Sequence, residues 1–189
     1  MYRVIKSLIS VSLIAFGVPV FAQETSNDDL SLGEPVGPQV GQSFVRQEYV
    51  DWTMRCIKAP EGQSDRCNLY QLLENDEGLA VAEFSLFRLP EAAEAAAGAT
   101  VVVPLETLLT EQLTLSVDGS NARRYPFTFC NPAGCVARIG FRASEIEEFK
   151  RGSTAVLRLV PAAAPDQQVV LSVSLAGFTA GFDALASPG

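Results

Sequence analysis

The residues of this sequence whose type and spacing could do chemistry are its four cysteines, Cys56, Cys67, Cys130 and Cys135. An even number of cysteines in an exported chain favours disulfides, and three pairings are open. We predict Cys56 with Cys67 and Cys130 with Cys135, because each pair flanks a short loop between two expected neighbouring strands. In the chain-entropy model such short loops contribute roughly 2 to 3 kcal/mol of stability per bridge.

Two other roles for the cysteines are open. A zinc site would have the right ligand type, but the usual Cys-x-x-Cys spacing is absent and an oxidising compartment disfavours thiolate ligands. A redox-active Cys130–Cys135 pair also lacks the Cys-x-x-Cys spacing at a helix start that lowers a thiol pKa. We therefore expect structural disulfides, with no metal site and no cofactor.

The sequence contains no histidine. It thus lacks the usual general base of serine and cysteine hydrolases and the commonest zinc ligand. A Ser-Lys or paired-carboxylate mechanism stays formally open, but no spacing in the chain indicates one. We expect no catalytic residues and no enzymatic activity.

Three further features could carry a binding function. Trp52 could stack on a sugar, but its place on one strand face with Met54 and Cys56 favours the core. The doublet Arg123-Arg124 could bind an anion, although a solvated strand start is the commoner state of such residues. The segment Asn27-Asp28-Asp29 has the oxygen density that calcium needs, without a glycine-centred loop pattern.

The N-terminal segment is typical of a cleaved signal peptide. Arg3 and Lys6 precede an apolar run, and small residues before Gln23 place cleavage after Ala22. The apolar run is too short for a bilayer-spanning helix, so we expect no transmembrane segment in the mature chain. The expected location is the periplasm, the cell surface or the medium.

Charge and composition define the expected partners and domains. Removing Arg3 and Lys6 from the fourteen basic residues leaves twelve against twenty-two acidic residues, a net charge of −10 for the mature chain. Such a chain is repelled by phosphate backbones, so nucleic acid is not an expected partner. We predict a signal peptide over residues 1–22, a flexible acidic arm over 23–43 and a single domain over 44–189.

From Phe44 onward the dominant hydrophobic period is two, which indicates half-buried strands. Turn signals such as Asp118-Gly119 and Asn131-Pro132-Ala133-Gly134 separate them. The predicted strands are residues 52–56, 67–73, 79–89, 100–103, 113–117, 125–129, 135–141, 154–160 and 168–175. Many short strands with little helix predict an all-β antiparallel sandwich or barrel.

Three segments have helical character. The alanine-rich segment Glu91 to Ala99 would tolerate a helical turn. Ser144 with Glu147 forms the pattern of a capping box, and Gly152 marks the stop of that short helix. Phe178, Phe182 and Leu185 lie at near-helical spacing and predict a terminal turn that closes the core. Three carboxylates lie near expected turns or helix starts, those of Asp118, Glu145 and Asp183. They should accept hydrogen bonds from backbone amides or interact favourably with the helix dipole.

An ordered set of motifs resembles the invasion-associated locus B family of exported bacterial proteins. The motifs are Asp51-Trp52 with Arg55-Cys56, then Cys67, then Phe129-Cys130 with Gly134-Cys135-Val136-Ala137, and finally Leu175-Ala176-Gly177-Phe178. The resemblance covers residues 44–186, with one departure, since Val50 stands where family members often have glycine. It implies an immunoglobulin-like β-sandwich, export, and in founding members a part in host-cell entry, without catalytic residues or a cofactor.

We therefore expect a noncatalytic envelope protein that acts by binding a protein or a surface, with a link to host-cell invasion and virulence as the family implies. The alternative is a periplasmic factor for envelope integrity or quality control. A stable specific partner favours the first hypothesis, whereas broad capture of unfolded clients favours the second.

Overall fold

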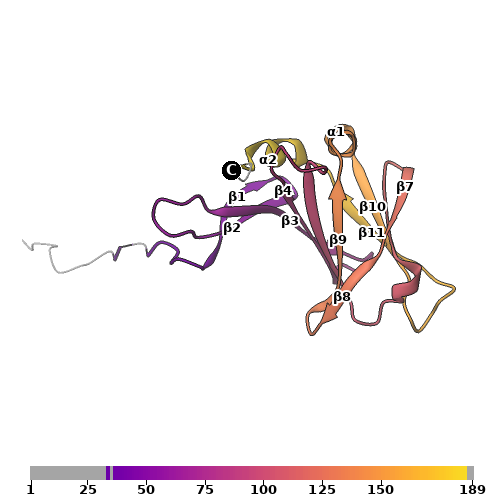
Figure 1. The fold of residues 1–189 in the computed structure, drawn as a ribbon. Helices are drawn as coiled ribbons and strands as arrows, with labels where there is room; N and C mark the ends of the chain where they lie inside the picture. Colours follow the sequence, from indigo (N-terminus) through magenta and orange to yellow (C-terminus); the bar gives the residue numbers. More distant parts are fainter. Residues whose placement is uncertain (1–32, 35, 187–189) are drawn as a thin grey trace, which may run out of the picture. The chain divides into compact units, whose positions relative to one another are not determined.

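The structure is a computed structural model that describes residues 33–34 and 36–186. The predicted signal peptide, the Asn27-Asp28-Asp29 segment and much of the predicted arm lie outside the described residues. The folded unit spans Gly37–Gly189, and its described part forms two antiparallel sheets and two short helices (Figure 1). The all-β prediction with short helices is confirmed, while the immunoglobulin-like connectivity stays a prediction.

The larger sheet has seven strands in the spatial order β1-β2-β3-β4-β5-β9-β8. Every neighbouring pair is antiparallel, and alternate side chains face the core. The strand bounds are Ser43–Tyr49 for β1, Trp52–Ile57 for β2, Arg66–Glu74 for β3, Ala80–Arg88 for β4, Ala97–Val103 for β5, Phe127–Asn131 for β8 and Gly134–Phe141 for β9.

The smaller sheet has four strands in the order β11-β10-β6-β7. Their bounds are Leu113–Val117 for β6, Ser120–Tyr125 for β7, Thr154–Leu159 for β10 and Val169–Ser174 for β11. Asp118 and Gly119 join β6 to β7 with φ of 47° and 74°, as the predicted tight turn requires. The Asp118 carboxylate also accepts hydrogen bonds from the backbone amides of Ser153 and Thr154.

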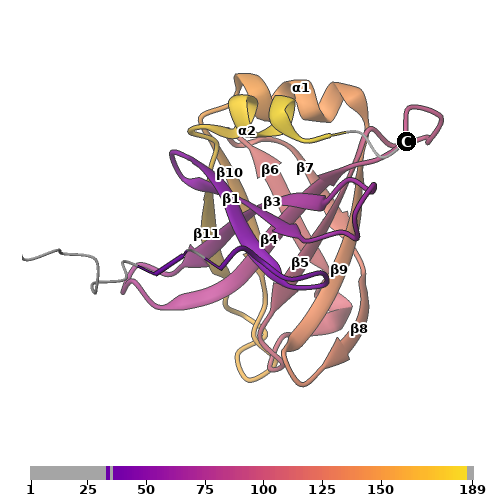
Figure 2. The same cartoon turned by 90° about the vertical axis from the view of Figure 1, so that its left-hand side faces the viewer.

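The helices α1 (Ala143–Arg151) and α2 (Phe178–Ala184) lie side by side over one end of the sheets, as Figure 2 shows. Both bury their apolar residues in the core that the two sheets share. Ring centroids 5.1 to 5.4 Å apart join four aromatic residues across this region, in the order Phe141, Phe149, Phe178 and Trp52. The predicted C-terminal helical turn that closes the core is therefore present.

A 3₁₀ helix spans Leu109–Glu111. Within the described part of the chain, no helix is long and apolar enough to cross a membrane.

The prediction of one strand over residues 125–129 is wrong. Pro126 separates β7 of the smaller sheet from β8 of the larger one, so Tyr125 and Phe127 belong to different sheets. Proline has no amide to donate to a ladder and breaks the pairing at this position. The alternating pattern of the side chains continues across the break, and for this reason the sequence pattern did not reveal it.

The predicted helical turn over Glu91 to Ala99 is also wrong. Residues 91–96 form turns, and residues 97–99 begin β5, which lies between β4 and β9. Alanine favours a helix in isolation, but pairing on both sides overrides that preference. The small side chains are needed here, because a Cβ on Gly98 would lie 2.6 Å from the Phe87 ring.

The capping residues at the start of α1 are not the predicted pair Ser144 and Glu147. The helix begins at Ala143, and the Arg142 amide donates to the Glu145 carboxylate at 2.9 Å, so Glu145 and not Glu147 closes the first turn. Gly152 ends the helix as expected, but its φ of −74° is an ordinary one. Glycine is needed there for space, since a Cβ would lie 2.5 Å from the Val117 side chain.

Candidate functional site

A polar junction joins β11 of the smaller sheet to β2 and β3 of the larger one. The Trp52 indole Nε1 donates to the Ser174 carbonyl at 2.8 Å. The Gln71 side chain accepts from the Ser174 amide at 2.8 Å, and donates to the Ser174 and Asp51 carbonyls at 3.1 and 3.0 Å. Trp52 is fully buried and Gln71 nearly so. The Asp51-Trp52 motif thus contacts the end of β11, directly before the Leu175-Ala176-Gly177-Phe178 motif, and Trp52 belongs to the core as the strand pattern favoured.

Two residues beside this junction adopt left-handed backbone conformations. Val50 has a φ of 56° and Gly177 a φ of 83°. A Cβ on Gly177 would lie 2.0 Å from the Tyr49 carbonyl oxygen, so only glycine fits there. The glycine that the family resemblance leads us to expect at position 50 would relax the turn between β1 and β2, whereas Val50 occupies it with strain.

Both disulfides link residues directly opposite each other on neighbouring strands. Cys56 of β2 is bonded to Cys67 of β3, and Cys130 of β8 to Cys135 of β9, with Cα atoms 4.0 Å apart in each case. These are the pairings expected from the sequence. Cys56 and Cys135 are buried, whereas Cys67 is half-buried and Cys130 is exposed. Each bridge therefore connects the core to the surface of the larger sheet.

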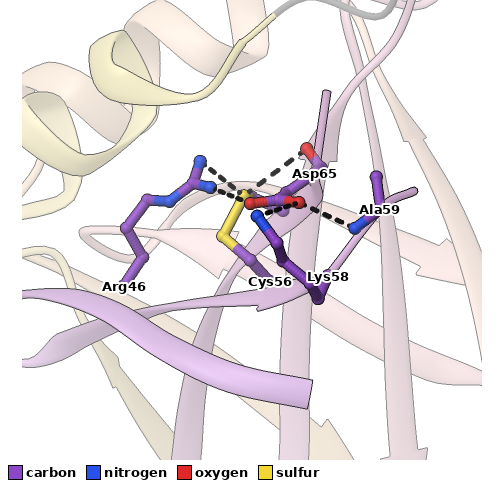
Figure 3. Close-up of polar contacts among 6 residues, drawn as sticks. Arg46, Cys56, Lys58, Ala59 and Asp65 are labelled. Atoms are coloured by element: carbon purple, nitrogen blue, oxygen red, sulfur yellow. Dashed lines mark hydrogen bonds and ion pairs between the residues drawn. A yellow bond between two sulfur atoms is a disulfide. The ribbon is translucent and has the colours of Figure 1, made fainter. Parts of the chain in front are cut away.

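The Cys56–Cys67 bridge lies beneath a charged cluster centred on Asp65, as Figure 3 shows. The Asp65 carboxylate accepts from the Ala59 amide at 2.7 Å, forms an ion pair with the Arg46 guanidinium, and lies 3.7 Å from the Lys58 ammonium. Arg46 Nη1 also donates to the Cys67 sulfur at 3.2 Å. The Ala59 hydrogen bond, with the Lys58 and Arg46 charges, lowers the pKa of Asp65 against the opposing effect of desolvation. The cluster closes the β2–β3 loop over the disulfide.

A second charged group occupies the start of α1. The buried Glu145 carboxylate lies 3.0 Å from Arg123 Nε, besides accepting from the Arg142 amide. Burial of the Tyr125 phenol, with the nearby Glu145 charge, raises the pKa of Tyr125 to about 12. Arg123 and Arg124 are both exposed, as the sequence favoured, and Arg123 in addition pairs with the buried Glu145.

A cavity of about 380 Å³ lies among the β4–β5 loop, α1 and α2. Its charged wall includes Arg88 and Lys150, which lie 3.7 and 2.9 Å from the same Asp183 oxygen. The hydrogen bond to Asp183 raises the pKa of Lys150, because it stabilises the ammonium form. The sequence pattern did not indicate this cavity, because its lining comes from three separate segments between Arg88 and Phe182.

The chemistry these residues can do is limited. Within the described part of the chain, no group of three or more His, Cys, Asp or Glu side chains could hold a metal ion. Each shifted pKa arises in an ion pair or a hydrogen bond that closes a loop or a helix, or from burial. Gln71 was also missed as a key residue, although its polar side chain on the apolar face of a predicted strand was a visible signal.

Two antiparallel sheets with two disulfides and a polar inter-sheet junction define a disulfide-stabilised β protein, and the disulfides suggest an extracytoplasmic one. The model of the Invasion associated locus B (IalB) protein family matches residues 52–186, and the chain belongs to this family. The family is not known as enzymatic.

Known proteins support the same assignment. Two invasion protein B homologs, from Brucella abortus strain 2308 and from Brucella abortus biovar 1 strain 9-941, are each 26% identical over 143 residues. The alignment covers 76% of this chain and 80% of each relative. The crystal structure of invasion associated protein B from Bartonella henselae superposes with a TM-score of 0.60 at 25% identity, covering 71% of this chain and 90% of that one.

Proposed function

We propose that this protein is exported to the cell envelope and acts there by binding a protein or surface partner, without catalysis. The observation that carries the proposal is the match of the family over residues 52–186. In this proposal an immunoglobulin-like sandwich presents loops and a sheet face to the partner. The relatives are named for invasion, and we extend to this chain a role in contact with host cells.

Two further features support export. The first twenty-two residues have the pattern of a signal peptide, and the cysteines form two disulfides that an oxidising compartment maintains. Both bridges lie in the larger sheet, whose inward-facing side chains form a hydrophobic core. The periplasm or the cell surface is the compartment in which such bridges persist.

The noncatalytic part of the proposal rests on the chemistry of the side chains. The chain has no histidine to act as a general base. Asp65, Glu145 and Lys150 each have more than one polar partner, and each stabilises a loop or a helix. Such residues are positioned for rigidity, which suits a binding scaffold.

Export and binding can be tested in two successive experiments. Fractionation of the producing bacterium, with protease treatment of intact cells and mass determination of the N-terminus, should find a mature chain that begins at Gln23 outside the cytoplasm. The mature protein, immobilised and exposed to envelope and host-surface extracts, should then retain one stable partner. An unprocessed cytoplasmic chain, or capture of many unfolded proteins without preference, would contradict the proposal, and the second result would favour a quality-control role.

A further inference from the structure

The cavity among the β4–β5 loop, α1 and α2 has an apolar floor. Leu89, Ala96, Ile146 and Phe182 contribute to it. Its volume of about 380 Å³ lies within the range of functional binding cavities, roughly 300 to 1,000 Å³. An extended aliphatic side chain, with its neighbours in a peptide, can therefore be accommodated.

The positive charges of the wall are already neutralised. The Arg88 guanidinium and the Lys150 ammonium lie 4.6 and 5.4 Å from the centre of the Phe182 ring, and both contact Asp183. Lys150 also lies 3.5 Å from Glu147. Carboxylates of the protein itself neutralise these two cations, so they are not available to bind an anionic ligand.

The negative charges at the rim are not neutralised. Glu91 and Glu94 line the cavity and are exposed, and among the described residues their carboxylates have no ion-pair or hydrogen-bond partner. The cavity therefore combines an apolar floor with an uncompensated acidic rim. Lysine and arginine side chains have the complementary form, an apolar stem with a cationic end.

We propose that this cavity docks a lysine or arginine side chain from a basic segment of a partner polypeptide. The stem lies on Ile146 and the alanines, and the cationic end pairs with Glu91 and Glu94. The inference rests on the proposed binding function and adds the chemistry of the partner.

The segments of this sequence next to the described residues are not basic. Residues 23–32, which follow the predicted signal peptide, and residues 187–189 contain no lysine or arginine. A second copy is also disfavoured, because the chain carries a net charge of −8 and two copies repel each other. The same charge attracts a basic partner over a long range.

The first test uses a defined probe. The mature protein labelled with nitrogen-15 is titrated with the peptide Ala-Lys-Ala-Lys-Ala, blocked at both ends, and with the matching peptide that has glutamate at both lysine positions. The lysine peptide should shift amide signals of residues 89–96 and of α1 more than those of the rest of the protein, and the glutamate peptide should not. Shifts spread evenly over the surface, or stronger binding of the glutamate peptide, would overturn the proposal.

Variants separate local docking from general charge attraction. The double variant Glu91→Gln/Glu94→Gln should weaken the lysine peptide about threefold to tenfold, because two exposed ion pairs are lost. The control Glu61→Gln/Glu77→Gln removes the same charge from exposed loop positions outside the cavity and should leave the affinity nearly unchanged. Equal weakening in both double variants would refute the site.

A steric variant tests the cavity without a change of charge. Ala93 is exposed and lines the cavity, so Ala93→Trp should block the peptide while the dispersion of the amide spectrum stays that of a folded protein. A partner retained equally by wild type and Glu91→Gln/Glu94→Gln would disprove this site and leave the binding function standing. A lysine peptide that binds in the cavity, with no partner retained from the extracts, would support the site and contradict the proposed function.

Discussion

Val50 adopts a strained backbone conformation in the turn between β1 and β2. Its φ of 56° lies in the left-handed region, and its side chain is 78% exposed, so packing does not compensate for the strain. For a β-branched residue this conformation costs roughly 1 to 2 kcal/mol. The turn it occupies lies directly before the Asp51-Trp52 motif.

We predict that Val50→Gly stabilises the protein by about 1 kcal/mol, or roughly 2 to 4 °C in melting temperature, after the higher entropy of glycine in the unfolded chain is included. Val40→Gly is the matched control, because Val40 is also exposed but has no positive φ, and it should not raise the melting temperature. Calorimetry measures both variants. A fall in melting temperature for Val50→Gly would show that the backbone strain at Val50 does not lower the stability of the protein.

Asp65 is a second single residue of interest, because its contribution to the stability of the folded protein depends on pH. Because its pKa is lower in the folded than in the unfolded state, its stabilisation is complete above the ordinary value near 3.8 and is lost as the pH falls through the folded-state pKa. Asp65→Asn should therefore melt below the wild type at pH 7, and the difference should shrink as the pH falls below about 4. Asp166→Asn, at an exposed loop position, is the control. A difference that does not change with pH would argue against the ion-pair cluster.

At the scale of elements, one amide side chain hydrogen-bonds β3 to β11. Gln71 satisfies both backbone groups of Ser174, which is 103 residues away in the sequence. Trp52 donates to the same carbonyl, so the edge of the smaller sheet is held by side chains of the larger one. A hydrogen-bonded side chain here takes the place of the neighbouring strand that this edge lacks.

Gln71→Ala should lower the free energy of unfolding by about 2 to 3 kcal/mol, because it removes three hydrogen bonds and leaves the Ser174 amide without its partner. Urea unfolding followed by Trp52 fluorescence gives the value. Gln63→Ala, in the exposed β2–β3 loop, controls for the loss of a glutamine side chain and should cost little. A cost below about 0.5 kcal/mol at Gln71 would show that water replaces the amide.

At the scale of the whole molecule, the disulfides differ in the loops they close. The Cys56–Cys67 bridge spans 11 residues and the Cys130–Cys135 bridge spans 5. In the chain-entropy model the longer loop contributes about 3 kcal/mol and the shorter about 2 kcal/mol. Each bridge lowers the conformational entropy of the unfolded chain by closing its own loop.

Cys56→Ala/Cys67→Ala should lower the melting temperature by several degrees, and by more than Cys130→Ala/Cys135→Ala. Thiol titration of the unreduced wild type, folded and in denaturant, should find no free thiol. An unchanged melting temperature in the first double variant would show that its bridge contributes nothing to stability, and free thiols in the wild type would contradict both pairings.

The sequence by itself determined the class of fold, the cysteine pairing and the family. These follow from local information, because a period of two assigns side chains to a buried or an exposed face, as for Ala82, Phe84 and Leu86, and because each cysteine pair lies across one short loop. Only the tertiary structure decided which sheet each strand joins, how Gln71 meets Ser174, and where the cavity forms. Those features depend on contacts between segments distant in the chain, and the break at Pro126 and the strand β5 show that such contacts override local preference.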